Sequence, residues 1–180
     1  MVQDVEIFIG IAHIAGIFVG FGALISLTRK NEIEVSQLGR IRSIVTTGLM
    51  VIVAALIPIG FNRYGVTGHN LWFFCSLIYF CLNSAVAILS LRNPENKKVV
   101  ITQMRSSPVT TVFFFLLLEI PLQVPLILVM IGLYPDLEPA LYTTALFFNL
   151  FEAAVVLAQL VYLQVEGSSG KRSSERPLHI

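Results

Sequence analysis

Two acidic residues, Glu119 and Glu152, stand in stretches of sequence that are otherwise almost entirely apolar. An unpaired ionised carboxylate in hydrocarbon costs several kcal/mol, so such a group is protonated, paired, or used to bind a proton or a cation. If both stretches are helices, the rise per residue places Glu119 roughly 22 Å and Glu152 roughly 20 Å from the same end of the molecule. We therefore expect the two carboxylates to lie nearly level and to share one polar site.

Further polar side chains that suit the same site recur in the apolar stretches. Spacings of three, four and seven residues keep them on one face of each predicted helix. Their amides and one imidazole can hydrogen-bond to a carboxyl group or line the approach to it. The candidate substrate-binding or ion-binding residues are Glu119, Glu152, His13, Asn149, Gln123 and Asn83. We assign no residue a catalytic role.

Two prolines, Pro121 and Pro125, follow Glu119 in the stretch "FFLLLEIPLQVP". Proline lacks an N–H group, so these residues free the carbonyls of Leu117 and Pro121, four positions earlier, and predict a kinked helix. Freed carbonyls beside a carboxylate can coordinate a cation, and interrupted helices occur at the sites of many transporters. Prolines in membrane spans also bend helices without any such role, so the pair by itself is a weak indication.

A structural interpretation of the same residues is as consistent with the sequence as a functional one. A protonated Glu119 or Glu152 bonded to an amide would join two helices without moving any ion. His13 is more readily interpreted as a hydrogen-bonded packing residue than as a ligand. No E-x-x-H or H-x-x-x-H pair supplies neighbouring metal ligands, so a metal site stays undetermined. We expect no cofactor, because no cofactor motif occurs in the chain.

The composition predicts the elements that would position these residues. Hydrophobic residues make up 56% of the 180 and charged residues 13%, and the mean hydropathy is +0.80. Such values are typical of an integral membrane protein. Backbone groups in lipid must be satisfied within a segment, so the spans should be α-helices of about 20 residues. Five stretches meet or approach this length, the second being the shortest: 6–27, 43–61, 71–91, 109–134 and 140–165.

The positions of the basic residues predict the orientation. Eleven of the twelve Lys and Arg residues fall in the first loop, the third loop and the C-terminal segment, and only Arg63 falls elsewhere. Basic residues near a span favour the cytoplasmic side, which places the N-terminus outside and the C-terminus inside. Four aromatic residues then fall near the outer surface, where amphipathic rings prefer the headgroup layer: Tyr64, Trp72, Tyr134 and Tyr142.

The remaining segments predict a simple domain organisation. Residues 1–165 form a single five-helix transmembrane domain, and the polar, small-residue-rich segment 166–180 is a disordered cytoplasmic tail. Residues 92–107, "RNPENKKVVITQMRSS", are typical of an amphipathic helix on the cytoplasmic surface. Gly16 and Gly20 form a GxxxG pair, which indicates close helix packing.

Two functional classes fit these observations. The first is a proton- or cation-translocating transporter or channel that uses the midmembrane carboxylates Glu119 and Glu152. The alternative is a non-catalytic membrane subunit or helix-packing partner of a larger complex. A membrane enzyme comes third, because no nucleophile or catalytic pair is visible. The expected partners are the lipid bilayer and a homo-oligomer or larger complex, not nucleic acid. We expect a location in a plasma membrane of the bacterial inner-membrane type.

Overall fold

The computed structural model describes residues 5–28, 35–92 and 108–174. These residues form five α-helices and one short 3₁₀-helix, joined by turns, which confirms the all-α class over the described part of the chain. The elements are α1 (Val5–Thr28), α2 (Val35–Arg63), α3 (Gly68–Arg92), α5 (Pro108–Ile131), η1 (Pro135–Leu137) and α6 (Glu138–Ser174).

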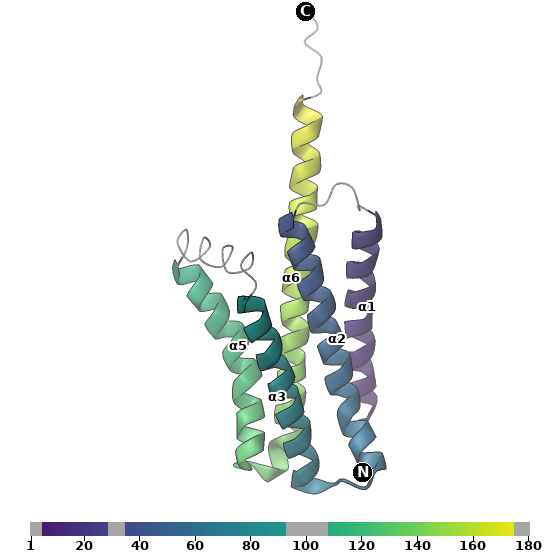
Figure 1. Cartoon of the computed structure of the whole chain (residues 1–180), viewed down its shortest axis with the longest axis vertical. Coiled ribbons are helices and arrows are strands. Elements are labelled where there is room, and N and C mark those ends of the chain that lie inside the picture. Colours follow the sequence, from purple (N-terminus) through teal and green to yellow (C-terminus); the bar gives the residue numbers. More distant parts are fainter. Residues whose placement is uncertain (1–4, 29–34, 93–107, 175–180) are drawn as a thin grey trace, which may run out of the picture.

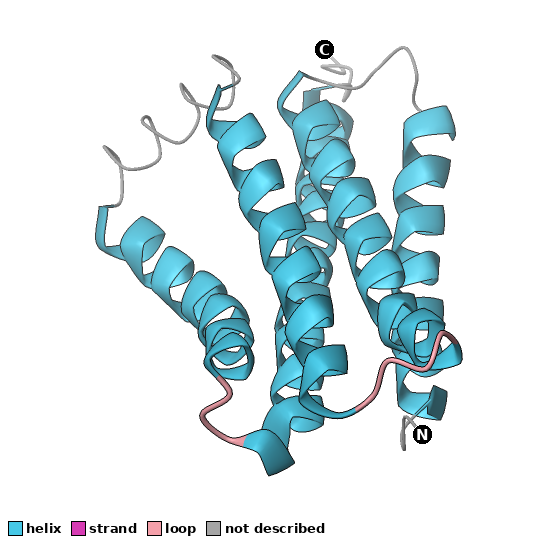
Figure 2. Cartoon of the chain, turned by 60° about the horizontal axis from the view of Figure 1, so that its bottom comes forward, coloured by secondary structure: helices cyan, strands magenta, loops and turns pink. Residues whose placement is uncertain are grey.

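Successive helices run in alternating directions (Figure 1). The start of α1, the α2–α3 turn and the α5–α6 connection consequently lie at one end, the lower end of Figure 1. Figure 2 shows the two short connections at this end. Helix α6 contacts each of the other four helices, and α1 packs most extensively against α2. The alternation brings together the loops that we predicted to face outward, while the side of the membrane that they face stays a prediction.

Within the described residues, four helical segments are long and apolar enough to cross a membrane, which supports a membrane location. They are Val5–Leu27, Ile41–Arg63, Gly68–Leu89 and Pro135–Val161. The second of these was the shortest span predicted from sequence. Helix α5 is 24 residues long, but its described apolar part, Glu119–Ile131, is shorter than a span. The predicted span 109–134 and the kink at the two prolines of α5 stay predictions.

Two helices extend beyond their predicted spans. Helix α2 begins at Val35, well before the predicted start at residue 43. Helix α6 continues to Ser174, so residues 166–174 are helical where we expected a disordered tail. Lengthening an existing helix requires no new nucleus, which allows polar residues to continue it past the membrane. Residues 175–180 and 93–107, the latter holding most of the predicted amphipathic helix, lie outside the described residues.

The closest approach between α1 and α2 does not involve the GxxxG pair. A Cβ added at Gly16 or Gly20 would meet nothing within 4 Å, so the predicted packing role is wrong for contacts within this chain. A Cβ at Gly48 would lie 2.6 Å from Val19 Cγ2 and 3.3 Å from the Ala15 carbonyl oxygen. Small residues at this contact let two backbones approach, which is the main source of helix association in lipid.

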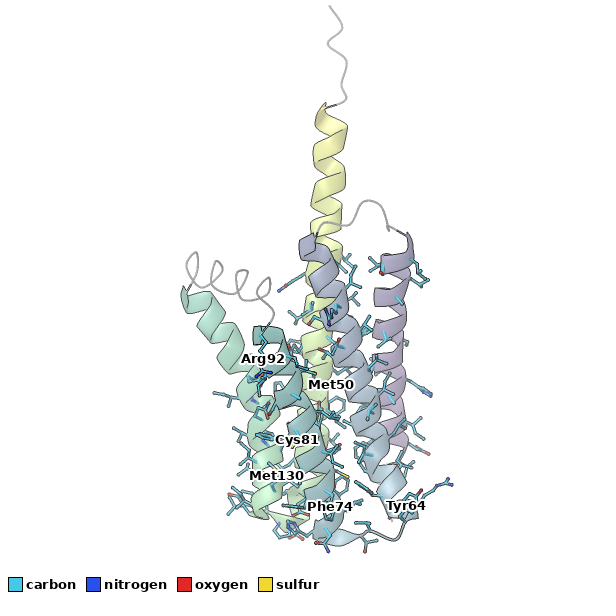
Figure 3. All side chains as sticks on the ribbon, viewed as in Figure 1. Met50, Tyr64, Phe74, Cys81, Arg92 and Met130 are labelled. Atoms are coloured by element: carbon cyan, nitrogen blue, oxygen red, sulfur yellow. The ribbon has the colours of Figure 1, made fainter. Side chains whose placement is uncertain are left out.

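Aromatic residues near the lower end of the bundle pack against one another between the helices. Trp72 and Tyr142 are 8% and 0% exposed, so their rings pack inside the bundle, while their level at the headgroup layer stays a prediction. Their ring centroids lie 5.7 Å apart, and the Phe8 ring of α1 contacts each of them. Tyr64 and Tyr134 are 88% and 50% exposed, and Figure 3 shows Tyr64 near the lower end of α2. The buried rings hold α1, α3 and α6 together.

Candidate functional site

Polar side chains gather on the facing sides of α3, α5 and α6. On each helix they are three, four or seven residues apart, which places them on one face. We call this group the polar site. Its members are Ser76, Tyr79 and Asn83 on α3, Glu119 and Gln123 on α5, and Asn149 and Glu152 on α6.

A buried hydrogen bond joins α3 to α6 within the polar site. Asn149 Nδ2 donates to Tyr79 Oη over 2.6 Å, and both side chains are at most 1% exposed. The carbonyl oxygen of the same amide, Asn149 Oδ1, is buried and has no hydrogen-bond partner. The bond to Tyr79 thus orients the Asn149 amide and leaves one acceptor available.

A second oriented amide lies on α5. Gln123 Nε2 donates to Glu119 Oε1 over 2.9 Å, between side chains four residues apart on the same helix face. Both side chains are half-buried. Gln123 Oε1 is buried without a partner, as Asn149 Oδ1 is. Each amide therefore donates through its nitrogen and leaves its oxygen unpaired.

The carboxylates of Glu119 and Glu152 come within electrostatic range of one another. Glu152 also interacts electrostatically with Tyr79 on α3. Two negative charges in low-dielectric surroundings repel one another more than they do in water. A proton or a cation held between the two carboxylates removes that repulsion.

Two further polar atoms on α3 are buried without partners, Ser76 Oγ and Asn83 Nδ2. Leaving a buried donor or acceptor unsatisfied costs about 1–3 kcal/mol, so such atoms normally bond to water or to a ligand. Asn83 was a candidate from sequence, and it lies four residues from Tyr79 on the same face. The polar site therefore has hydrogen-bonding capacity that the described side chains do not use.

His13 is the candidate that the structure does not place on the facing sides of α3, α5 and α6. Its side chain is exposed on α1, and α1 packs chiefly against α2 and α6. Ile11 and Ala15 form the buried face of α1. His13 stands two residues from each of them, and two residues turn a helix by about 200°. The same geometry that buries Ile11 and Ala15 points His13 outward.

Tyr142 has a role that the sequence analysis missed. Its hydroxyl donates to the carbonyl oxygen of Ala54 on α2 over 2.8 Å, in the buried core. Residue 58, four positions after Ala54, is a proline and cannot donate the usual helical N–H to that carbonyl. The tyrosine hydroxyl replaces the missing donor. Pro58 was a signal that one carbonyl of α2 needed a partner, but it did not indicate which residue supplies it.

A histidine–glutamate contact at the lower end was also missed. His69 Nδ1 hydrogen-bonds to Glu138 Oε1 and joins the first turns of α3 and α6. The Glu138 side chain is 2% exposed and that of His69 is 45% exposed. Gly132 has a φ of +70°, and a Cβ there would lie 3.1 Å from the His69 ring. The partners are 69 residues apart, so no local pattern connects them.

The polar site is rich in oxygen and contains two carboxylates. Among the described residues no group of three or more His, Cys, Asp or Glu side chains is placed to hold a metal ion. Amide oxygens are also common ligands of hard cations, and the polar site contains two that have no hydrogen-bond partner. The chain matches no protein-family model, and it is not significantly similar to any curated protein or solved structure with which it was compared.

Proposed function

We propose that this chain is a small multi-pass membrane protein that binds a proton or a small cation at the polar site and moves it across the membrane. The observation that carries the proposal is the electrostatic interaction of Glu119 on α5 with Glu152 on α6, two helices that pack against each other. Acidic residues within membrane helices are costly, and they occur mostly on ion or proton pathways. In this proposal α5 also crosses the membrane, which gives five spans, and the N-terminus faces outward.

The surroundings of the two carboxylates support a positively charged ligand. Glu119, Glu152 and the two unpaired amide oxygens all accept, and no Lys or Arg residue is among the members of the polar site. The nitrogens of the same two amides, Gln123 Nε2 and Asn149 Nδ2, are already used in hydrogen bonds, whereas Asn83 Nδ2 and Ser76 Oγ on α3 have no partner. A proton or a cation is the species that such a set of acceptors binds.

Helix α5 is the element best suited to move during transport. Pro121 and Pro125 lie just after Glu119 and weaken the internal hydrogen bonding of the helix. In both views the Pro108 end of α5 leans away from the other helices, whereas its Ile131 end lies close to α6 (Figures 1 and 2). Bending at the prolines would change the distance between Glu119 and Glu152, and with it the affinity for the ligand.

Flux into reconstituted vesicles tests this proposal. Wild-type protein should carry protons or a cation faster than protein-free vesicles do. Glu119→Gln and Glu152→Gln should each abolish the flux, because glutamine keeps the shape of a protonated glutamate but cannot titrate or carry charge. Glu6→Gln, at the exposed start of α1, is the matched control and should transport normally. No wild-type flux of protons, Na⁺, K⁺ or divalent metals would overturn the proposal.

The second candidate function is that of a packing partner in a larger assembly. The observation that favours it is His13, which is exposed on α1 among apolar neighbours such as Ile9, Ile14 and Ile17. An imidazole that faces lipid is unfavourable, and a helix of another chain would cover it. If this is the role, wild-type vesicles show no flux, and the two glutamine variants still assemble normally.

A further inference from the structure

We infer that the ligand of the polar site is a divalent metal cation held by four protein oxygens. The ligands are the carboxylates of Glu119 and Glu152 together with Gln123 Oε1 and Asn149 Oδ1. The inference rests on the proposed function, because it names the ligand class of the same site.

The orientation of the two amides is the first support. Each amide nitrogen is engaged: Gln123 Nε2 donates to Glu119, and Asn149 Nδ2 donates to Tyr79. The atoms left without partners are in both cases the carbonyl oxygens, and both are buried. A carbonyl oxygen can accept a hydrogen bond or ligate a cation, but it cannot bind an anion. Asn149 is only 1% exposed, so bulk water does not reach its oxygen.

The spacing of the four residues is the second support. On α5 the carboxylate and the amide are four residues apart, and on α6 they are three residues apart. Either spacing places the pair one helical turn apart on one face. The two pairs lie on neighbouring helices, because α5 packs against α6, and their carboxylates interact electrostatically. Each helix therefore contributes one charged and one neutral oxygen ligand.

Charge and ligand type select the cation. Two ionised carboxylates carry a formal charge of −2, which a divalent ion neutralises and a monovalent ion does not. Hard cations such as Mg²⁺, Mn²⁺ and Ca²⁺ prefer carboxylate and amide oxygens and complete their coordination with water. A proton shared by the two carboxylates would relieve their repulsion but would leave both amide oxygens unpaired. A cation with several ligands binds all four oxygen groups at once.

Mn²⁺ is the probe that tests this inference, because its paramagnetic resonance signal broadens when the ion is bound. The purified full chain in lipid nanodiscs should bind one Mn²⁺ per chain, and Mg²⁺ or Ca²⁺ should displace it. Glu119→Gln and Glu152→Gln should each weaken binding by at least about tenfold, the usual effect of losing one charged contact. Gln123→Met keeps the side-chain length, removes the amide oxygen, and should weaken binding less.

Matched controls make the result specific. Glu6→Gln removes an exposed carboxylate from α1 and should leave Mn²⁺ affinity unchanged. Mn²⁺ should also raise the unfolding temperature of the wild type but not that of Glu152→Gln, since a ligand stabilises only the state that binds it. Circular dichroism and gel filtration establish that each variant is folded before its affinity is compared.

The inference and the proposed function fail in different ways. Proton flux without saturable Mn²⁺ binding by the wild type would overturn the inference and leave the proposed function standing. Saturable Mn²⁺ binding that needs both glutamates, without any flux, would support the inference and refute translocation. Mn²⁺ binding that is unchanged in folded Glu119→Gln and Glu152→Gln would place the metal elsewhere and overturn the inference.

Discussion

The stability that the hydrogen bond from Tyr142 to α2 contributes should depend on Pro58, the residue that leaves the Ala54 carbonyl without its helical donor. Pro58 cannot donate to the Ala54 carbonyl, and Tyr142 Oη lies 2.8 Å from that oxygen. Replacing Tyr142 by phenylalanine removes only the hydroxyl and keeps the buried ring in place. The change should therefore leave the Ala54 carbonyl buried without a donor and lower the stability of the protein.

Two ranges of hydrogen-bond energies set the expected loss of stability in Tyr142→Phe. A buried acceptor left unsatisfied costs about 1–3 kcal/mol, whereas interhelical hydrogen bonds in membrane proteins average about 0.6 kcal/mol and reach about 1.7 kcal/mol. The Tyr142 side chain is 0% exposed, so water does not replace the lost hydroxyl. We expect Tyr142→Phe to lower the free energy of unfolding by about 1–1.7 kcal/mol, at the upper end of the membrane range.

A double-mutant cycle isolates the cause. Pro58→Ala restores an N–H group that can donate to the Ala54 carbonyl, so Tyr142→Phe in that background should cost less than about 0.5 kcal/mol. The measurement is equilibrium unfolding by dodecyl sulfate in mixed micelles, followed by circular dichroism. Tyr134→Phe, on a tyrosine that is 50% exposed, is the control and should be nearly neutral. An equal cost of Tyr142→Phe with proline and with alanine at position 58 would refute the reasoning.

The remaining predictions concern helix packing and orientation. Gly48→Ala should lower the free energy of unfolding by about 1–3 kcal/mol, because its new Cβ would lie 2.6 Å from Val19 Cγ2. Gly20→Ala is the control and should be nearly neutral in the same unfolding assay. A larger loss of stability in Gly20→Ala than in Gly48→Ala would contradict the α1–α2 contact. With Cys81 replaced by serine, a cysteine introduced at Thr67 should react with an impermeant thiol reagent on intact cells, and one at Ser36 should not. Labelling at Ser36 alone would reverse the orientation.

The elements of this fold could be predicted from sequence because the bilayer constrains them strongly. Lipid offers no hydrogen bonds to the backbone, so each apolar stretch of sufficient length must be helical. The predicted span 6–27 accordingly agrees with α1, Val5–Thr28. The polar candidates in the later spans could also be recognised one by one, since ionisable and amide side chains stand out in an apolar sequence.

The partners of these residues were decided by the tertiary structure. Tyr79 was not a candidate, although it shares a face with Asn83, because a tyrosine in an apolar helix does not reveal what its hydroxyl meets. The contact between His69 and Glu138 joins residues far apart in the chain, and its geometry depends on how α3 and α6 start beside each other. Long-range pairs of this kind leave no local pattern.

The inward face of each helix was likewise decided only by the tertiary structure. Ile11 is 2% exposed and Ile17 is 55% exposed, although both are isoleucines of the same helix. In a soluble protein, a polar outer face would distinguish them. Lipid is as apolar as the protein core, so the outer face of a membrane helix needs no polar residues. Polarity alone therefore suggested that His13 points inward, whereas packing around Ile11 and Ala15 turned it outward.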